Sequence, residues 1–338
     1  LQQDKPEPEI TLDINIAALS LAEMGNWLSV PELNQGRVIG KVYLNGTPKR
    51  LDHRLELEMN GQTLTAEGVL TSDNYHDIGL VTNGTIRHLN PAGWPLDATS
   101  GWPGDLNSDF YLRVEKLEKP ERKARLAGQL MASKLTDYKI DNGTFDLEID
   151  NDKLVLSEIL LNGQTGQLRI QGQAQGINSL SKSVTTKVRA EIRNLDTTAI
   201  LPSSQLGGMV NIDLNVNAAG KLATSGKFDP IDWTGKADLQ LFPSVLLDTE
   251  NNEGKLAAEW NGSILQLTAL ELQTEWGRAS LKGQTTLQPL SYQINGEIVI
   301  AELKKIIPPL KKIAPQVPVD QVPNGYLKIN GAVIGKNK

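Results

Sequence analysis

Residues 142–175 read NGTFDLEIDNDKLVLSEILLNGQTGQLRIQGQAQ, and this stretch decides the fold class. Phe145, Leu147 and Ile149 alternate with polar residues, and the same alternation returns at Leu168. Successive side chains of a β-strand point to opposite faces, so strict alternation predicts strands with one apolar and one polar face. Strands buried on both faces would be apolar throughout. The stretch therefore predicts antiparallel β-structure with one face in water.

The same alternation recurs along most of the chain and sets the expected architecture. It is present at residues 55–59, at 210–216 and again at 326–329. We therefore predict an all-β, mainly antiparallel protein with a few short helices, in which strands exceed half of the residues. The expected form is an elongated, curved and twisted sheet, built from repeats, whose apolar face forms a groove.

Turn chemistry also favours hairpins. The dipeptide Asn-Gly suits type I′ hairpin turns because both of its residues adopt a positive φ. It occurs nine times, whereas a random order of the same residues would give about two. We expect these dipeptides to mark hairpins; they begin at Asn45, Asn60, Asn83, Asn142, Asn162, Asn261, Asn295, Asn324 and Asn330.

Four segments interrupt the β pattern and resemble one another. They begin at Ile16, Ile86, Ile192 and Ile300, and the last three starts are separated by 106 and 108 residues. Each combines a strand end, a short helical turn, a Pro/Gly crossing and a new strand, which predicts a quasi-one-dimensional array. We expect one elongated repeat domain over residues 1–338, with units near 1–85, 86–191, 192–299 and an incomplete 300–338.

A sheet with one apolar face has three ways to shield that face. It can pack on a second sheet, close into a barrel, or curl into a trough. The chain has only 4 Phe, 6 Tyr and 6 Trp, and glycines inside strands, at Gly172 and Gly331, permit strong bending. A curved trough fits these features best, and a sandwich is the alternative. The expected lining is Phe145, Leu147, Ile149, Leu168, Ile170, Ile212, Leu214, Val216, Leu239, Leu241, Leu327 and Ile329.

Charge and composition exclude several classes of protein. The net charge of −6 argues against a surface that binds nucleic acid or an anionic membrane broadly. The absence of cysteine excludes a disulfide scaffold, a thiol nucleophile and a cysteine-ligated metal site. No window approaches the roughly 18 consecutive apolar residues of a membrane-spanning helix. Because the chain begins at Leu1, we expect it to be a processed or excised part of a longer protein.

Residues that carry chemistry are few. His53, His76 and His88 are scattered without a second metal ligand at suitable spacing. The sequence lacks a phosphate-binding loop and a nucleophile elbow. The acidic residues between Asp141 and Asp152 do not have the spacing of a calcium-binding loop. We therefore expect a protein that is not an enzyme, with no catalytic residues, no metal and no cofactor.

Two modules suggest a family. They share a proline, a glycine five residues later and alternating strands after it, and they read VPELNQGRVIGKVYLNGT at residues 30–47 and LPSSQLGGMVNIDLNVNAAG at 201–220. They resemble the TamB and AsmA-like proteins of Gram-negative bacteria, as does IRHLNPAGWPLD at 86–97. The resemblance spans most of the chain. The family's N-terminal anchor helix and C-terminal domain are not within it.

The resemblance implies a location, a cargo and partners. It implies a periplasmic protein, anchored in the inner membrane, whose long β-groove carries phospholipid between the two membranes. It also implies partnership with an outer-membrane Omp85-type barrel, TamA, and a part in autotransporter assembly. The anchor and the barrel contact would belong to parts of the parent protein that this chain lacks.

Three functions follow as hypotheses. The first is a lipid conduit, because each methylene group moved from water to an apolar surface contributes about 0.8 kcal/mol and no specific polar site is needed. The second is a structural or chaperone scaffold that binds client strands at its sheet edges by β-augmentation. The third, glycan binding or hydrolysis, would need an aromatic platform and converging carboxylates. The composition favours the conduit.

Overall fold

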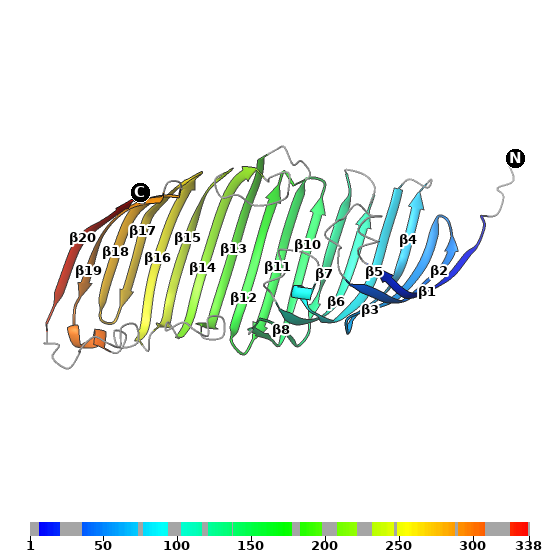
Figure 1. Ribbon diagram of the computed structural model, residues 1–338, viewed down its shortest axis with the longest axis horizontal. Helices are drawn as coiled ribbons and strands as arrows, with labels where there is room; N and C mark the ends of the chain where they lie inside the picture. The colour runs from blue at the N-terminus through cyan, green and yellow to red at the C-terminus, as the bar shows by residue number, and fades with distance from the viewer. Residues whose placement is uncertain are drawn as a thin grey trace. The chain divides into compact units, whose positions relative to one another are not determined.

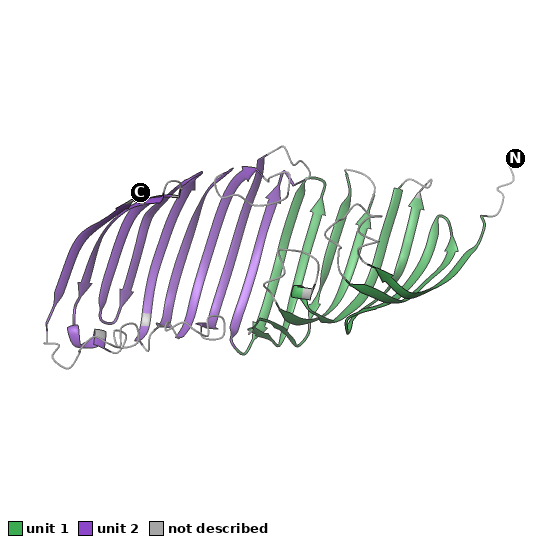
Figure 2. Cartoon of the chain, viewed as in Figure 1, with its two compact units in different colours: residues 1–164 green, residues 165–338 purple. Residues whose placement is uncertain are grey.

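The structure is a computed structural model of the chain. It describes residues 7–20, 36–73, 77–93, 103–116, 121–136, 138–177, 183–197, 208–221, 232–246, 249–287, 290–307 and 325–336. In these residues the elements are strands, apart from two short 3₁₀ helices, and every strand pairing is antiparallel (Figure 1). The predicted all-β antiparallel fold class is therefore confirmed. The chain divides into two compact units, residues 1–164 and 165–338, which are described separately (Figure 2).

The first unit contains one main sheet. Its strands pair in the order β1-β2-β3-β4-β5-β6-β7-β10-β11, each antiparallel to the next. The strands β8 and β9 form a small second sheet with the start of β6. The bounds are β1 Ile10–Ser20, β2 Arg37–Thr47, β3 Arg50–Met59, β4 Gln62–Asp73, β5 Asp77–Leu89, helix η1 Pro91–Gly93, β6 Gly104–Glu115, β7 Lys123–Leu130, β8 Ser133–Leu135, β9 Tyr138–Ile140, β10 Asn142–Asp150 and β11 Lys153–Gly163.

The second unit is simpler, because each strand pairs antiparallel with the strand that follows it in sequence. The bounds are β12 Gly166–Gln175, β13 Ser183–Asp196, β14 Gly208–Lys221, β15 Trp233–Leu246, β16 Thr249–Asn261, β17 Ile264–Thr274, β18 Gly277–Leu287, β19 Leu290–Ile300, helix η4 Leu303–Ile306 and β20 Leu327–Lys336. Within each unit these strands form one layer. The sandwich alternative, which needs two packed sheets of long strands, does not describe either unit.

Most Asn-Gly dipeptides do not form the predicted hairpin turns. Among the described residues, only Asn60-Gly61 supplies both residues of a two-residue turn, with φ of 53° and 80° between β3 and β4. Asn83-Gly84, Asn295-Gly296 and Asn330-Gly331 lie inside β5, β19 and β20. Asn324 lies outside the described residues. Inside these strands the dipeptide places its asparagine on the polar face and its glycine on the apolar face.

Glycines on the apolar face lie beneath large side chains of a neighbouring strand. A methyl group added at Gly128 would collide with the Phe145 ring, and one added at Gly235 would collide with Trp260. The aromatic ring therefore lies across the neighbouring glycine. Gly331, in contrast, has nothing within 4 Å of an added methyl group. Glycines such as Gly128 and Gly235 therefore have a packing role. The bending expected at Gly172 and Gly331 stays a prediction.

We predict different responses to alanine at two strand glycines of the second unit. Gly235→Ala should lower the free energy of unfolding by about 1–3 kcal/mol, because the methyl group displaces the Trp260 ring and meets backbone. Gly331→Ala should stay within about 0.5 kcal/mol of the parent chain. Urea denaturation followed by circular dichroism measures both. Equal destabilisation by the two substitutions would contradict the packing role of Gly235.

Candidate functional site

The candidate functional site is the apolar face of each sheet, because cross-strand partners place the apolar residues of every strand on one side. In the first unit Phe145 is paired with Ile159 on one side and Gly128 on the other, and Gly128 is paired with Phe110. The rows of Leu147 and Ile149 continue in the same way through leucines and alanine. Asp146 pairs with Ala127 and Glu158 on the opposite face.

The second unit repeats this arrangement. Leu168, Ile192, Ile212 and Leu241 form one row across four strands. Asp213 pairs with Glu191 and Gln240 on the opposite, polar face. The other predicted residues of this unit occupy neighbouring rows of the same apolar face: Ile170, Leu214, Val216, Leu239, Leu327 and Ile329. The registers therefore place all nine predicted residues of this unit on one face, and the three of the first unit on its apolar face.

No described element covers these faces, and their side chains remain partly exposed. Among the described residues, only eleven apolar side chains are buried. Several of these lie near strand ends, such as Val184, Leu195 and Ile300. On the apolar face of the second unit, Ile294 is 36%, Leu327 39% and Ile329 49% exposed. Each face is thus an aliphatic surface without a protein layer above it.

Part of each apolar face lies outside the predicted set of lining residues. Leu256, Leu270 and Leu281 form a row in β16, β17 and β18, but a register shift at Ala257/Ala258 breaks the alternation near them. At the start of the first unit, Leu12 and Ile14 face Leu44 and Val42. Apolar and polar residues still alternate on either side of these interruptions, which are single small residues. The alternation could therefore have identified the apolar face in those strands as well.

One polar pair interrupts the apolar face of the first unit. His53 on β3 is buried, and its Nε2 lies 3.0 Å from Oγ1 of Thr82 on β5, across the glycine position Gly68 of β4. Thr82 Oγ1 donates its proton to the Glu67 carbonyl at 3.0 Å, so Nε2 of His53 is the donor of the pair. His53 Nδ1 is buried without a hydrogen-bond partner. The apolar surroundings lower the pKa of His53 and outweigh the opposing effect of the Asp52 charge.

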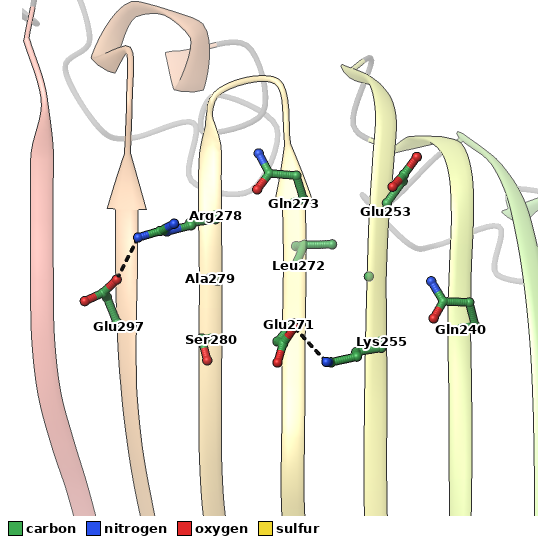
Figure 3. A pocket seen from close by; sticks show the side chains of 11 residues that line it. Gln240, Glu253, Lys255, Glu271, Leu272, Gln273, Arg278, Ala279, Ser280 and Glu297 are labelled. Carbon is green, nitrogen blue, oxygen red and sulfur yellow. Dashed lines mark hydrogen bonds and ion pairs between the residues drawn. The ribbon is translucent and has the colours of Figure 1, made fainter.

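The opposite faces carry charges that are paired with one another. Around a shallow depression of the second unit, Lys255 contacts Glu271 at 3.0 Å and Arg278 contacts Glu297 at 3.4 Å (Figure 3). Lys328 contacts Glu297 at 2.5 Å, and this hydrogen bond is the main reason why the pKa of Glu297 is lowered. Exposed pairs of this kind contribute modestly to stability. Four of the five charged residues that line the depression are therefore in ion pairs.

Two equivalent networks fix the bulged ends of β5 and β13. Arg87 donates to the carbonyls of Ile86 and Ser108 and to Asp109 at 2.8 Å, where the register of β5 and β6 shifts. Arg193 donates to the carbonyls of Ile192 and Ile212 and to Asp213 at 2.5 Å, where β13 and β14 shift. The networks recur 106 residues apart, at two of the predicted repeat starts. The division into four repeat units remains a prediction.

Asparagine side chains complete both networks. Asn107 accepts a hydrogen bond from the backbone N–H of His88, and Asn211 accepts one from that of Asn194. His88 and Asn194 both adopt a positive φ, 57° and 52°, which places their N–H groups outside the strand ladder. Asn107 and Asn211 then donate to carbonyls of the next strand segment, at Ala132 and Pro243. Asn211 therefore has a structural role on the polar face, because its side chain binds backbone groups of two other residues.

The described residues hold no group of three or more His, Asp or Glu side chains that could bind a metal ion. His88 lies at the surface, with Nδ1 3.2 Å from Asp105, and His76 lies outside the described residues. In the part of the chain that the structure describes, no helix has the length and apolar character needed to span a membrane.

We predict that His53 makes stability depend on pH. Its pKa is lowered in the folded chain, so as the pH falls below about 6.5 the unfolded chain takes up the proton first. The free energy of unfolding should therefore decrease from that pH down to the lowered pKa of the folded state. Urea denaturation at a series of pH values from about 7.5 to about 5 measures this, because that range brackets the ordinary histidine pKa of about 6.5. The His53→Gln variant should lose this component of the slope; an unchanged slope would contradict the assignment.

Comparison with known proteins gave no relatives. No protein-family model matches the chain. No curated protein matches it, and no solved structure matches it. The resemblance to TamB and AsmA-like proteins therefore stays a prediction from the sequence.

Proposed function

We propose that the chain is a section of a lipid conduit and holds phospholipid acyl chains along the apolar faces of its sheets. The observation that supports this most directly is an apolar face, contributed by strand after strand in each unit, that no described element covers. A soluble monomeric protein rarely exposes a contiguous apolar patch of more than a few hundred Å² unless the patch binds a partner. An acyl chain is a partner that needs only apolar contact.

The energetics of such a face suit transport. Each methylene group that leaves water for the face contributes about 0.8 kcal/mol, so two acyl chains are held without a polar recognition site. Aromatic rings that lie across glycines, such as Phe145 over Gly128, project less far from the apolar face. Leucine, isoleucine, valine and alanine in successive rows give similar contacts at each step. A lipid can therefore move along the face without a deep energy minimum.

The location and partners in this proposal come from the sequence resemblance. By that resemblance the chain would lie in the periplasm, in a parent protein anchored in the inner membrane, and phospholipid would pass toward the outer membrane. An Omp85-type barrel and autotransporter assembly would concern parts of the parent outside this chain. The proposed activity involves no covalent chemistry, and so the protein would not be an enzyme.

We predict that a charge on the apolar face blocks lipid locally. Leu214 lies in the row of Ile170 and Leu239. The substitution Leu214→Arg would place an uncompensated charge against acyl chains, at a cost of several kcal/mol. This cost lowers the local affinity for lipid more than tenfold. Purified protein is illuminated with a photoreactive phosphatidylcholine, and the cross-linked peptides are mapped by mass spectrometry. Cross-links in β13–β15 should fall more than tenfold, and those in other strands should persist.

The matched control is Asn215→Arg, which adds the same charge one residue further along β14. Asn215 is exposed on the polar face between Arg189 and Asp238, so cross-linking should be unchanged. Asn211 would be a poor control because it completes the Arg193 network. Circular dichroism verifies that both variants fold. Full cross-linking of a folded Leu214→Arg variant, or cross-links confined to the polar face, would refute the conduit.

A further inference from the structure

Among the described residues, the apolar face of the first unit carries one ionisable side chain, that of His53. The registers of the main sheet place no other histidine, and no lysine, arginine, aspartate or glutamate, on the apolar face of the described strands. From β2 to β6, the row that contains this histidine reads Leu44, His53, Gly68, Thr82 and Leu112. The same row continues to Leu147, one of the predicted lining residues. A charge at His53 would therefore lie in the path of an acyl chain that crosses these strands.

The hydrogen bonds of His53 decide which of its nitrogens can take up a proton. Oγ1 of Thr82 donates to the Glu67 carbonyl, so it accepts from Nε2 of His53. Nδ1 is then the nitrogen without a proton, and it is buried without a hydrogen-bond partner. The two side chains of the pair, His53 and Thr82, are only 8% and 5% exposed. A neutral imidazole fits this position, and a proton would add at Nδ1.

No charged group faces His53 from the described strands on either side. Its neighbours on the apolar face of β2, β4 and β5 are Leu44, Gly68 and Thr82. The titratable or charged residues next to this row lie on the polar face, and they are Tyr43, Asp52, Arg54 and Glu67. A protonated His53 would thus have a charge without a counterion and an Nδ1–H donor without an acceptor.

A protonated His53 ring has one route to water. The backbone of the sheet lies behind the ring, whereas no described element covers the apolar face in front of it. Because a buried charge without a partner is costly, the imidazolium would turn outward onto the apolar face. Desolvation of the charged form is also the main reason why the pKa of His53 is lowered. The surface that the charged ring enters is the surface on which acyl chains are proposed to lie.

We propose that His53 is a pH-sensitive gate on the lipid path of the first unit: the neutral ring leaves the apolar row open, and the protonated ring places a charge in that row and displaces lipid. This inference rests on the proposed function, because it concerns lipid on the same face. By linkage, bound lipid must also make His53 harder to protonate. The second unit has no such gate among its described residues, since its registers place no histidine, lysine, arginine, aspartate or glutamate on the apolar face.

The gate is tested on the parent chain, with the second unit as an internal control. Proton NMR of the three histidine rings gives the pH midpoint of His53, whose signal is the one that both His76→Gln and His88→Gln retain. Photoreactive phosphatidylcholine is then cross-linked at about one pH unit above and about one unit below that midpoint. The neutral fraction falls from about nine tenths to about one tenth, so cross-links in β2–β6 should fall about tenfold. Cross-links in β13–β15 should stay constant, and added lipid should lower the midpoint of His53.

Two glutamine variants separate the gate from a general effect of pH. His53→Gln keeps a donor for Thr82 and takes up no proton, so its cross-links in β2–β6 should be equal at the two pH values. The matched control His88→Gln removes an exposed histidine and should respond to pH as the parent chain does. Circular dichroism at both pH values verifies that the strands are retained.

The outcomes distinguish a failure of the gate from a failure of the conduit. If cross-links are absent from both units at both pH values, the proposed function and the gate are overturned together. The gate alone is overturned if cross-links in β2–β6 persist below the midpoint, if both units lose them equally, or if strand structure is lost with them. A midpoint that bound lipid leaves unchanged, or a pH response that His53→Gln retains, also overturns the gate alone.

Discussion

A β-sheet one layer thick leaves one face without a protein partner, and the rest of this structure depends on that constraint. A conventional core would bury the apolar residues of each strand between two layers. Here they stay partly exposed, and few apolar side chains of the described residues are buried. Stability must then come from the strand ladders, from cross-strand pairs within the apolar face and from charges on the other face. A ligand of the apolar face would replace the missing layer.

The ends of the strands show how a single layer remains ordered. At β5 and β13 the chain leaves the ladder with a non-glycine residue at positive φ, His88 or Asn194, which is a costly conformation. An arginine and an asparagine offset this cost by binding the carbonyl and N–H groups that the bulge leaves unpaired. The guanidinium of Arg193 also lies 5.3 Å from the centre of the Phe242 ring. Polar contacts thus take over where a second layer would normally fix the strand ends.

The sequence predicted the faces better than the turns. Alternation depends on the two-residue period of a strand, so Phe145 and Leu214 could be assigned to the apolar side from their neighbours alone. Asn-Gly was misleading because the same dipeptide satisfies two demands, a positive-φ turn at Asn60 and a polar residue before an apolar-face glycine at Asn83. The hydrogen bond of His53 and the role of Asn211 depend on partners 29 and 32 residues away, Thr82 and Pro243, which local patterns do not reveal.

A lipid on the apolar face would supply the contact that a second layer would otherwise give. It would leave the strand ladders unchanged, because the backbone groups of neighbouring strands within each unit already pair with one another. Rows of apolar side chains continue from strand to strand, as from Leu168 through Ile192 and Ile212 to Leu241. An acyl chain that lies across these strands would therefore meet apolar side chains at each step, without crossing a polar boundary.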